Sequence, residues 1–215
     1  MGNRLQMVKT LINGFSDFRK RFIKKEKLFF QNLAEKAQRP HTMVIACSDS
    51  RVDPAILFET EPGELFVVRN VANLVPPYRS NESVSEVSAA IEFGVRHLEV
   101  KNLVVLGHAF CGGINAFCSK IRGDATHKSE FIEPWLKILD PAAKNVDFSL
   151  SRQEFLRNME KEAIINSIKN LRTFPWIYNL EKKKKIQLHG WWFDIATGSL
   201  WSWANSESGF RKMSP

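Results

Sequence analysis

Three short apolar runs, each ending in polar residues, constrain the fold of this chain more than any other feature. The runs extend from Thr42 to Cys47, from Leu65 to Arg69 and from Leu103 to Leu106. Such runs, rich in β-branched residues and bounded by turn signals, are typical of buried strands. Apolar residues recur at helical spacing over residues 82–98, between the second and third runs. The alternation predicts an α/β fold with a mainly parallel central β-sheet flanked by helices.

The sequence after the third run predicts helices to about residue 171 and then an edge strand or hairpin. This last apolar stretch runs from Ile186 to Trp203 and contains the turn signal Thr197-Gly198. A chain of 215 residues is within the usual range of one domain, and no linker is visible. We therefore expect residues 41–215 to form a single α/β domain.

The first 40 residues differ from the rest in charge and in pattern. Apolar side chains recur at spacings of four, three and four residues, at Leu11, Phe15, Phe18 and Phe22. This segment carries 10 Lys and Arg against 3 Asp and Glu, whereas the rest of the chain carries 21 against 20. We expect residues 1–40 to form an amphipathic helical arm that packs on its own subunit or on another one. Docking of the arm on a membrane surface or on nucleic acid is the less favoured alternative, and the nearly neutral body argues against nucleic acid.

The cysteine count and the lack of long apolar runs bear on the compartment. Three cysteines cannot form a fully paired disulfide framework, and no apolar signal segment opens the sequence. We therefore expect a reducing, cytoplasmic setting, where cysteines are commonly metal ligands or nucleophiles. No apolar run approaches the roughly 20 residues needed to cross a bilayer, so we expect no membrane span.

Cys47, His108 and Cys111 fall where predicted strands end. Because the carboxyl ends of neighbouring parallel strands meet at one edge of the sheet, we expect these side chains to lie together. Two thiolates and an imidazole suit zinc, and three protein ligands leave one tetrahedral position open, as in catalytic sites. The alternative for each cysteine alone is a buried apolar thiol, which is the favoured interpretation of Cys118. The pattern predicts one zinc ion per chain.

Asp49 and Arg51 follow the first predicted ligand closely. In an extended turn their side chains would point the same way and could pair directly. An arginine fork can hold one carboxylate in a fixed orientation beside a metal-bound nucleophile. The alternative is a surface salt bridge of little energetic weight.

Three sequence blocks resemble the β-class carbonic anhydrases, in particular their plant-like branch. The blocks are Ala46-Cys47-Ser48-Asp49-Ser50-Arg51-Val52, the segment from Pro62 to Asn73, and Gly107-His108-Ala109-Phe110-Cys111-Gly112-Gly113. The resemblance extends from about Gln38 to Trp203. It implies reversible hydration of carbon dioxide to bicarbonate and a proton by a zinc-bound hydroxide.

The resemblance also implies a role for each matching residue. Zinc would be held by Cys47, His108 and Cys111, with Asp49 and Arg51 as the catalytic pair. Carbon dioxide would be bound by Gln38, Phe66, Phe93 and Gly112, partly across a dimer interface. Position 93 is Phe where plant relatives commonly have Tyr, so a hydroxyl is missing there.

The resemblance further implies a homodimer or dimer of dimers, in which the arm packs on a neighbouring subunit. Val44 and Phe193 stand where the other branch has the Trp and Tyr of a bicarbonate-binding inhibitory site, so we expect no such site.

A sulfur analogue such as carbonyl sulfide is an alternative substrate for the same zinc site. His41 and His97 are proton carriers only by their chemistry, and surface histidines are the favoured interpretation of both.

Overall fold

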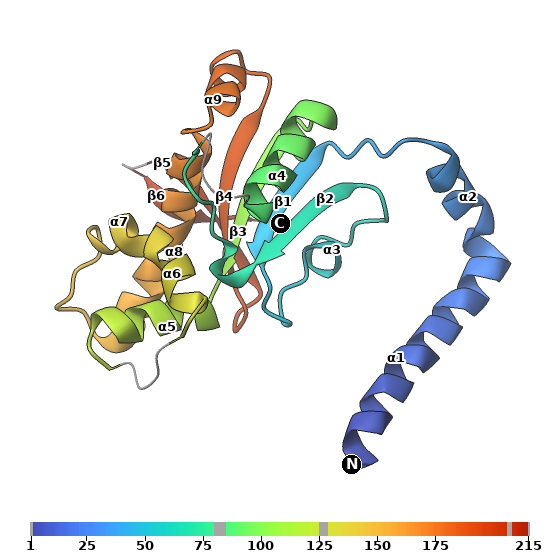
Figure 1. The fold of residues 1–215 in the computed structure, drawn as a ribbon, viewed down its shortest axis with the longest axis horizontal. Coiled ribbons are helices and arrows are strands. Elements are labelled where there is room, and N and C mark those ends of the chain that lie inside the picture. The colour runs from blue at the N-terminus through green and yellow to red at the C-terminus, as the bar shows by residue number, and fades with distance from the viewer. Residues whose placement is uncertain (1, 80–84, 125–128, 206–207, 215) are drawn as a thin grey trace. The chain divides into compact units, whose positions relative to one another are not determined.

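The computed structural model describes residues 2–79, 85–124, 129–205 and 208–214 (Figure 1). The chain divides into two compact units, Met1–Arg39 and Pro40–Pro215. Each unit has its own architecture, and the functional cluster lies in the second. No helix in the described ranges combines the length and the apolar character that a membrane span requires.

The first unit contains helices α1 (Gly2–Arg21) and α2 (Lys27–Glu35), joined by a π-helical turn. Phe18, Phe22 and Phe30 pack together, with ring centroids 5.1–6.1 Å apart. None of the side chains described in this unit's helices is buried. Nine of the large apolar side chains described in this unit are exposed: Met7, Val8, Leu11, Ile12, Phe15, Ile23, Leu28, Phe29 and Leu33. The predicted helix is confirmed. Of its apolar stripe, Leu11 and Phe15 are exposed, whereas Phe18 and Phe22 pack on Phe30.

The second unit is built on a six-stranded sheet of order β2-β1-β3-β4-β5-β6. Its strands are β1 (Thr42–Cys47), β2 (Leu65–Asn70), β3 (Asn102–His108), β4 (Gln187–Asp194), β5 (Ser199–Asn205) and β6 (Gly209–Lys212). The first four in space are parallel, and β5 and β6 are antiparallel. The predicted mainly parallel sheet is confirmed, and the last apolar stretch forms the predicted hairpin. Within this hairpin, β4 pairs with both β3 and β5 and is therefore an interior strand. The edge strands of the described sheet are β2 and β6.

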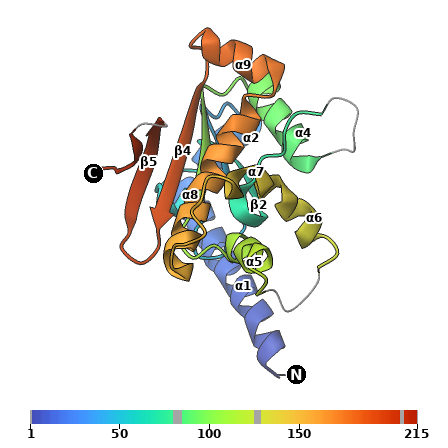
Figure 2. The same ribbon diagram turned by 90° about the vertical axis from the view of Figure 1, so that its left-hand side faces the viewer.

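Helices connect and cover these strands (Figure 2). They are α3 (Pro54–Leu57), α4 (Glu86–Glu92), α5 (Gly112–Ile121), α6 (Ile132–Leu136), α7 (Asp140–Ala143), α8 (Arg152–Leu171) and α9 (Pro175–Lys182). The helix expected over 82–98 is present as α4 and the π-helical turn Phe93–His97, while residues 82–84 lie outside the described ranges.

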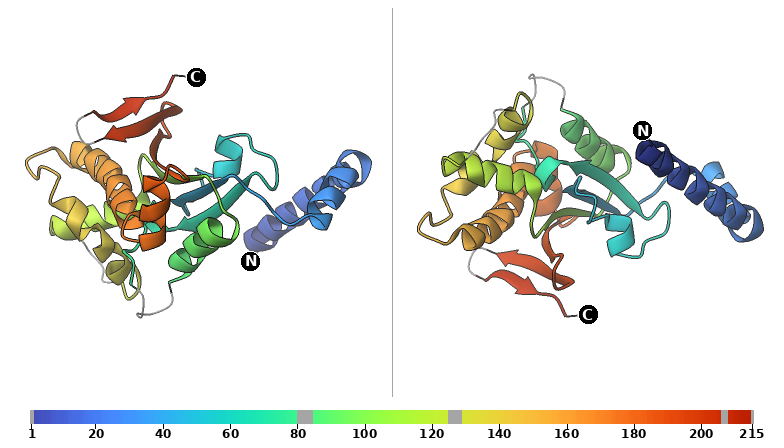
Figure 3. Two further views of the ribbon diagram at one scale, coloured as in Figure 1. Left: turned by 90° about the horizontal axis from the view of Figure 1, so that it is seen from above. Right: turned by 90° about the horizontal axis from the view of Figure 1, so that it is seen from below.

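The two faces of the sheet are covered differently (Figure 3). One face packs on α4 and α8, through side chains such as Ile45, Val105 and Ile164. On the other face, Val44 and Leu106 belong to a smaller cluster that includes Leu57 of α3, Phe58 and Trp191. Because both faces of the sheet are covered, the side chains on both sides of the buried strands are apolar. This explains why these strands are continuous apolar runs in the sequence.

Two glycines let α8 approach the sheet closely. A Cβ atom on Gly107 of β3 would lie 2.7 Å from Cδ1 of Ile164, and one on Gly190 of β4 would lie 2.9 Å from its Cγ2. Side chains at either position would push the helix away. Because Gly107 immediately precedes His108, this packing also fixes the strand end that carries the histidine.

Candidate metal centre

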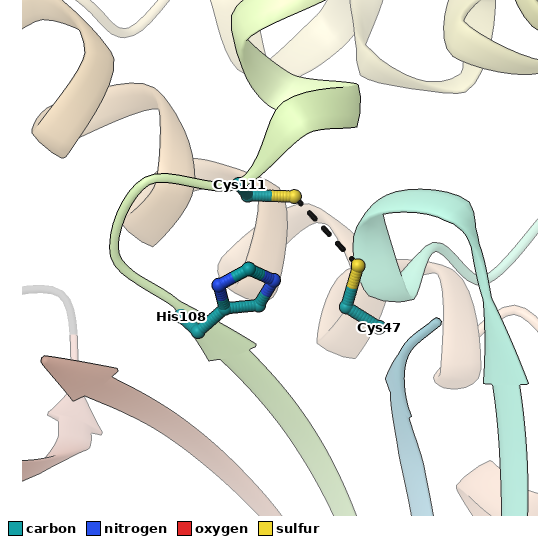
Figure 4. A group of neighbouring side chains, drawn as sticks. All are labelled: Cys47, His108 and Cys111. Carbon is teal, nitrogen blue, oxygen red and sulfur yellow. Dashed lines mark hydrogen bonds between the residues drawn. The ribbon is translucent and has the colours of Figure 1, made fainter. Parts of the chain in front are cut away.

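Cys47, His108 and Cys111 come together at the carboxyl ends of β1 and β3, as the sequence predicts (Figure 4). Cys47 is the last residue of β1, His108 is the last of β3, and Cys111 directly precedes α5. Their ligand atoms all lie within 4.8 Å of one another, and all three side chains are buried. No other such group of three or more His, Cys, Asp or Glu side chains occurs in the described ranges.

The geometry of the cluster fits a tetrahedral zinc ion. The two sulfur atoms are 3.8 Å apart. Two Zn–S bonds of about 2.3 Å at a tetrahedral angle would place them about 3.8 Å apart. Nδ1 of His108 lies 2.9 Å from the carbonyl oxygen of Ala109, so it is assigned as the protonated nitrogen. Its buried Nε2 has no hydrogen-bond partner among the described residues and is free to bind metal.

The protonation of the two thiols supports the same assignment. The hydrogen bond between the Cys111 and Cys47 sulfurs lowers the pKa of Cys47 and raises that of Cys111. Burial lowers the pKa of His108, but the Cys47 sulfur and the Ala109 carbonyl outweigh this effect and raise it. A divalent cation between the sulfurs would replace the shared proton and compensate two thiolates in a buried site.

Cys118 is a different kind of cysteine. It lies in α5, is 5% exposed, and is not part of the ligand group. Burial raises the pKa of its thiol to about 12. It therefore behaves as a small apolar side chain, as the sequence analysis favoured.

Asp49 and Arg51 form a two-pronged ion pair beside the cluster. Nε of Arg51 donates to Oδ1 of Asp49 at 2.9 Å, and Nη2 donates to Oδ2 at 2.7 Å. These hydrogen bonds hold the pKa of Asp49 well below its usual range. Oδ2 of Asp49 also lies 3.9 Å from Nε2 of His108, which places a carboxylate oxygen next to the ligand set.

Two further residues, which the sequence analysis did not single out, support the loops of the site. Arg69 of β2 donates to the carbonyl oxygens of Cys47, Asp49 and Val52 at 2.7–3.1 Å, and to Oδ2 of Asp53 at 2.8 Å. In the sequence, the sign of this role is the charged residue that ends the apolar run from Leu65 to Arg69.

Glu160 of α8 supports the other loop. Its side chain is 1% exposed and accepts hydrogen bonds from the Cys111 backbone, Arg157 and Trp192. Burial raises its pKa to about 7, although Arg157 opposes the shift. Nothing in its local sequence distinguishes it from the other glutamates of a polar helix.

The residues expected to bind carbon dioxide do not all lie at the cluster. Gly112 directly follows Cys111, and a Cβ atom placed on it would meet no atom within 4 Å. Phe66 pairs in register with Met43, four residues before Cys47, which is about 13 Å along the strand. Phe93 contacts Phe66 at a ring-centroid distance of 5.8 Å and is 43% exposed. Gln38 belongs to the first unit and is exposed in the extended segment after α2.

Three other residues named in the sequence analysis contact aromatic or apolar side chains. His97 stacks on Phe93 with ring centroids 5.5 Å apart. Val44 is buried, and Phe193 packs against the same cluster on the second face of the sheet. Apolar side chains therefore occupy both positions of the inhibitory site considered above.

Comparisons with known proteins agree with the fold and the cluster. A family model described as "Carbonic anhydrase" matches residues 42–200. The chain is 36% identical to "Beta carbonic anhydrase 3" of Arabidopsis thaliana over 204 residues, covering 94% of this chain and 78% of the relative. It is 37% identical to "Beta carbonic anhydrase 6, mitochondrial" of the same plant, covering 87% of this chain and 67% of the relative.

Solved structures give the same result. The β-carbonic anhydrase CcaA superposes with a TM-score of 0.87 at 27% identity, covering 98% of this chain and 93% of that one. One of two tetrameric β-carbonic anhydrases from Sordaria macrospora superposes with a TM-score of 0.75 at 28% identity, covering 94% and 98%.

Fold and cluster together define a class, namely an α/β metalloenzyme with a Cys-His-Cys metal cluster beside the carboxyl ends of two parallel strands. Within that class, the chain belongs to the β-class carbonic anhydrase family. It is a zinc-dependent lyase that interconverts carbon dioxide and bicarbonate.

Proposed function

We propose that Cys47, His108 and Cys111 bind one zinc ion per chain, and that Asp49 and Arg51 act at this centre in the hydration of carbon dioxide. The observation that carries the proposal is the 3.8 Å separation of the two sulfurs beside an unpartnered imidazole nitrogen. When bound, zinc supplies Lewis acidity that generates a nucleophile from water at accessible pH. The remaining roles belong to side chains of the protein.

Asp49 serves as the hydrogen-bond acceptor that orients the nucleophile. Its Oδ2 atom lies 3.9 Å from Nε2 of His108, so the carboxylate is next to the residues that would hold the metal. Arg51 holds both carboxylate oxygens and keeps them from turning toward the metal. Because its pKa is lowered, Asp49 stays an ionised acceptor throughout the neutral range. The absence of a side chain at Gly112 leaves room for substrate next to Cys111.

Phe66, Phe93 and Gln38 act in the site of a neighbouring subunit. Phe66 and Phe93 lie near the amino end of β2, about 13 Å along the strand from the residue that pairs with Cys47. The exposure of Phe93, at 43%, supports contact with another chain. Two copies related by a two-fold axis could each supply this aromatic pair to the metal centre of the other.

Contact between subunits also accounts for the division of the chain into an arm and a catalytic domain. Residues 1–40 form an arm that packs on a neighbouring subunit, and residues 41–215 form the catalytic domain. Uncovered Leu11 and Phe15, at 75% and 62% exposure, favour such contact. We infer a dimer or a dimer of dimers, and the tetrameric relative supports the larger assembly. Replacing Leu11 and Phe15 by Glu should lower the mass measured by light scattering, whereas Lys9→Glu should not.

We assign the protein to a reducing, cytoplasmic compartment. Its three cysteines are free and buried, and two of them must stay thiolates to bind zinc. One relative carries a mitochondrial name, so fractionation of cells is the test that separates the two compartments.

Stopped-flow hydration of carbon dioxide by protein of assayed metal content tests the proposal. We expect one zinc ion per chain and fast, zinc-dependent turnover. Carbonyl sulfide is assayed in parallel, because the same metal centre could hydrolyse it. Turnover of carbonyl sulfide without hydration of carbon dioxide would contradict the substrate assignment, and protein without zinc would contradict the metal assignment.

A further inference from the structure

The peptide bond between Phe110 and Cys111 is held at both ends by charged side chains. On one side, Nη2 of Arg51 donates to the carbonyl oxygen of Phe110 at 3.1 Å. On the other side, the Cys111 N–H donates to Oε1 of Glu160 at 3.2 Å. One peptide plane therefore connects the guanidinium of the catalytic pair to a buried carboxylate on α8.

Glu160 is itself fixed in place. Its Oε2 atom accepts from Nη1 of Arg157 at 2.7 Å and from Nε1 of Trp192 at 3.2 Å. The guanidinium carbon of Arg157 lies 3.9 Å from the centre of the Phe110 ring. The same residue pair thus contacts Phe110 through its ring and Cys111 through its backbone.

The backbone at this place needs such support. Phe110 has a φ of 60°, in the left-handed region that a residue with a side chain seldom adopts. It stands between two zinc ligands, His108 and Cys111. If the peptide turned, the Cys111 sulfur would leave its position and Arg51 would lose one of its acceptors, the Phe110 carbonyl oxygen.

We propose that Glu160, held by Arg157, is a positioning residue that locks the Phe110–Cys111 peptide, and through it both the Cys111 ligand and the Arg51 guanidinium. This inference rests on the proposed function, since it concerns the same zinc centre. Glu160 touches neither substrate nor metal and acts through the backbone. Groups that orient metal ligands commonly change metal affinity by about ten- to a hundredfold when replaced.

The sequence allows this peptide to be observed directly. Phe is followed by Cys only twice in the chain, at Phe110–Cys111 and at Phe117–Cys118. Zinc-loaded protein labelled with ¹³C at Phe carbonyls and ¹⁵N at Cys therefore gives two carbonyl-edited amide cross-peaks. The second peptide lies inside α5 and serves as an internal reference.

Three variants of Glu160 test whether its hydrogen-bond acceptor or its charge holds the peptide. Glu160→Met removes the acceptor, Glu160→Asp keeps the charge but shortens the side chain, and Glu160→Gln keeps an acceptor oxygen at the original reach. Glu162→Gln, on the same helix and bonded to Asn145 at 3.0 Å, is the matched control. Zinc release into excess chelator and thermal unfolding are measured on the same samples.

We expect the Cys111 amide proton to move upfield in the Met and Asp variants, with zinc release about tenfold faster or more. The Gln variant should deviate less than the Met and Asp variants, because its amide oxygen still accepts at the original reach although its NH2 group faces a donor. Arg51→Ala should move the Phe110 carbonyl resonance of the same cross-peak. If Glu160→Met fails to fold, the comparison of Asp with Gln decides.

Folded Asp and Gln variants that both keep the wild-type cross-peak and release rate would overturn the inference. A lowered melting temperature without a change at Cys111 would do so as well, because it indicates a purely structural role. The wild type separates the two proposals. If it binds zinc and hydrates carbon dioxide, failure of the variants removes only this inference; if it binds no zinc, both proposals fall.

Discussion

The two ends of the parallel strands present different groups of side chains. At the carboxyl ends of β1 and β3, a single chain brings together a complete ligand set and an oriented carboxylate. At the amino end of β2, Phe66 and Phe93 form an aromatic pair about 13 Å away along the strand. Under the proposed function, the difference teaches that one chain builds the whole metal centre but only part of a substrate pocket. Changes at the first end should act on the chain that carries them, and changes at the second on its neighbour.

Removing a ligand should have the largest effect. Cys47→Ala leaves one thiolate and one imidazole, too few to hold zinc in a buried site. We expect zinc to be lost and turnover to fall by more than about a thousandfold. Metal analysis and stopped flow check this, with Cys118→Ala as the control that keeps zinc and activity. Retained zinc in Cys47→Ala would show that the ligand set is wrongly assigned.

Loss of the guanidinium should cost less, because the metal stays. Arg51→Ala removes the two side-chain hydrogen bonds to the Asp49 carboxylate and leaves the one from the backbone N–H of residue 51. We expect kcat to fall by about a hundredfold with zinc still at one per chain. Arg96→Ala is the control, since Arg96 is an exposed arginine paired with Glu92 at 2.7 Å. Full turnover by Arg51→Ala would remove the catalytic pair from the account.

The dependence of kcat on pH should report ionisation at the metal centre and not at the Asp49 carboxylate. A carboxyl whose pKa is lowered by folding loses its stabilising interaction only as the pH falls through the folded value. The lowered pKa of Asp49 therefore keeps it ionised at neutral and alkaline pH. Two thiolates neutralise the zinc charge, so the nucleophile should form at higher pH than at a site of three neutral histidines. Stopped flow should find kcat rising from neutral to alkaline pH, and a flat profile would contradict this.

The smallest predicted effect concerns two cysteines of equal exposure. Cys47 and Cys118 are both 5% exposed, but the hydrogen bond with the Cys111 sulfur lowers the pKa of Cys47, whereas burial raises that of Cys118. In zinc-stripped protein at neutral pH, Cys47 should therefore carry the larger share of thiolate. The lower nucleophilicity of an acidic thiolate offsets part of the advantage, so we expect Cys47 to be alkylated about tenfold faster. Peptide mass mapping measures both rates, and zinc should protect Cys47; equal rates would contradict the assignment.

The sequence predicted the strands and the ligand cluster because each depends on local patterns. Apolar runs identify buried strands, and the rule that parallel strands end at one edge brings Cys47 and His108 together. The supporting contacts of Arg69 and Glu160 could not be predicted in this way. Each joins residues distant in the chain, and the contact from Glu160 to Cys111 spans 49 positions. The position of β4 inside the sheet also depends on pairing rather than on its own residues.

The central claim is that the metal and the aromatic pair of one site come from different chains. Differently tagged subunits carrying Cys47→Ala and Phe66→Ala/Phe93→Ala are co-expressed, and the mixed dimers are purified and assayed by stopped flow. A shared site predicts about half the wild-type turnover per dimer, because one of the two sites is then whole. Turnover no higher than that expected from the aromatic variant alone would contradict the claim and place the entire pocket within one chain.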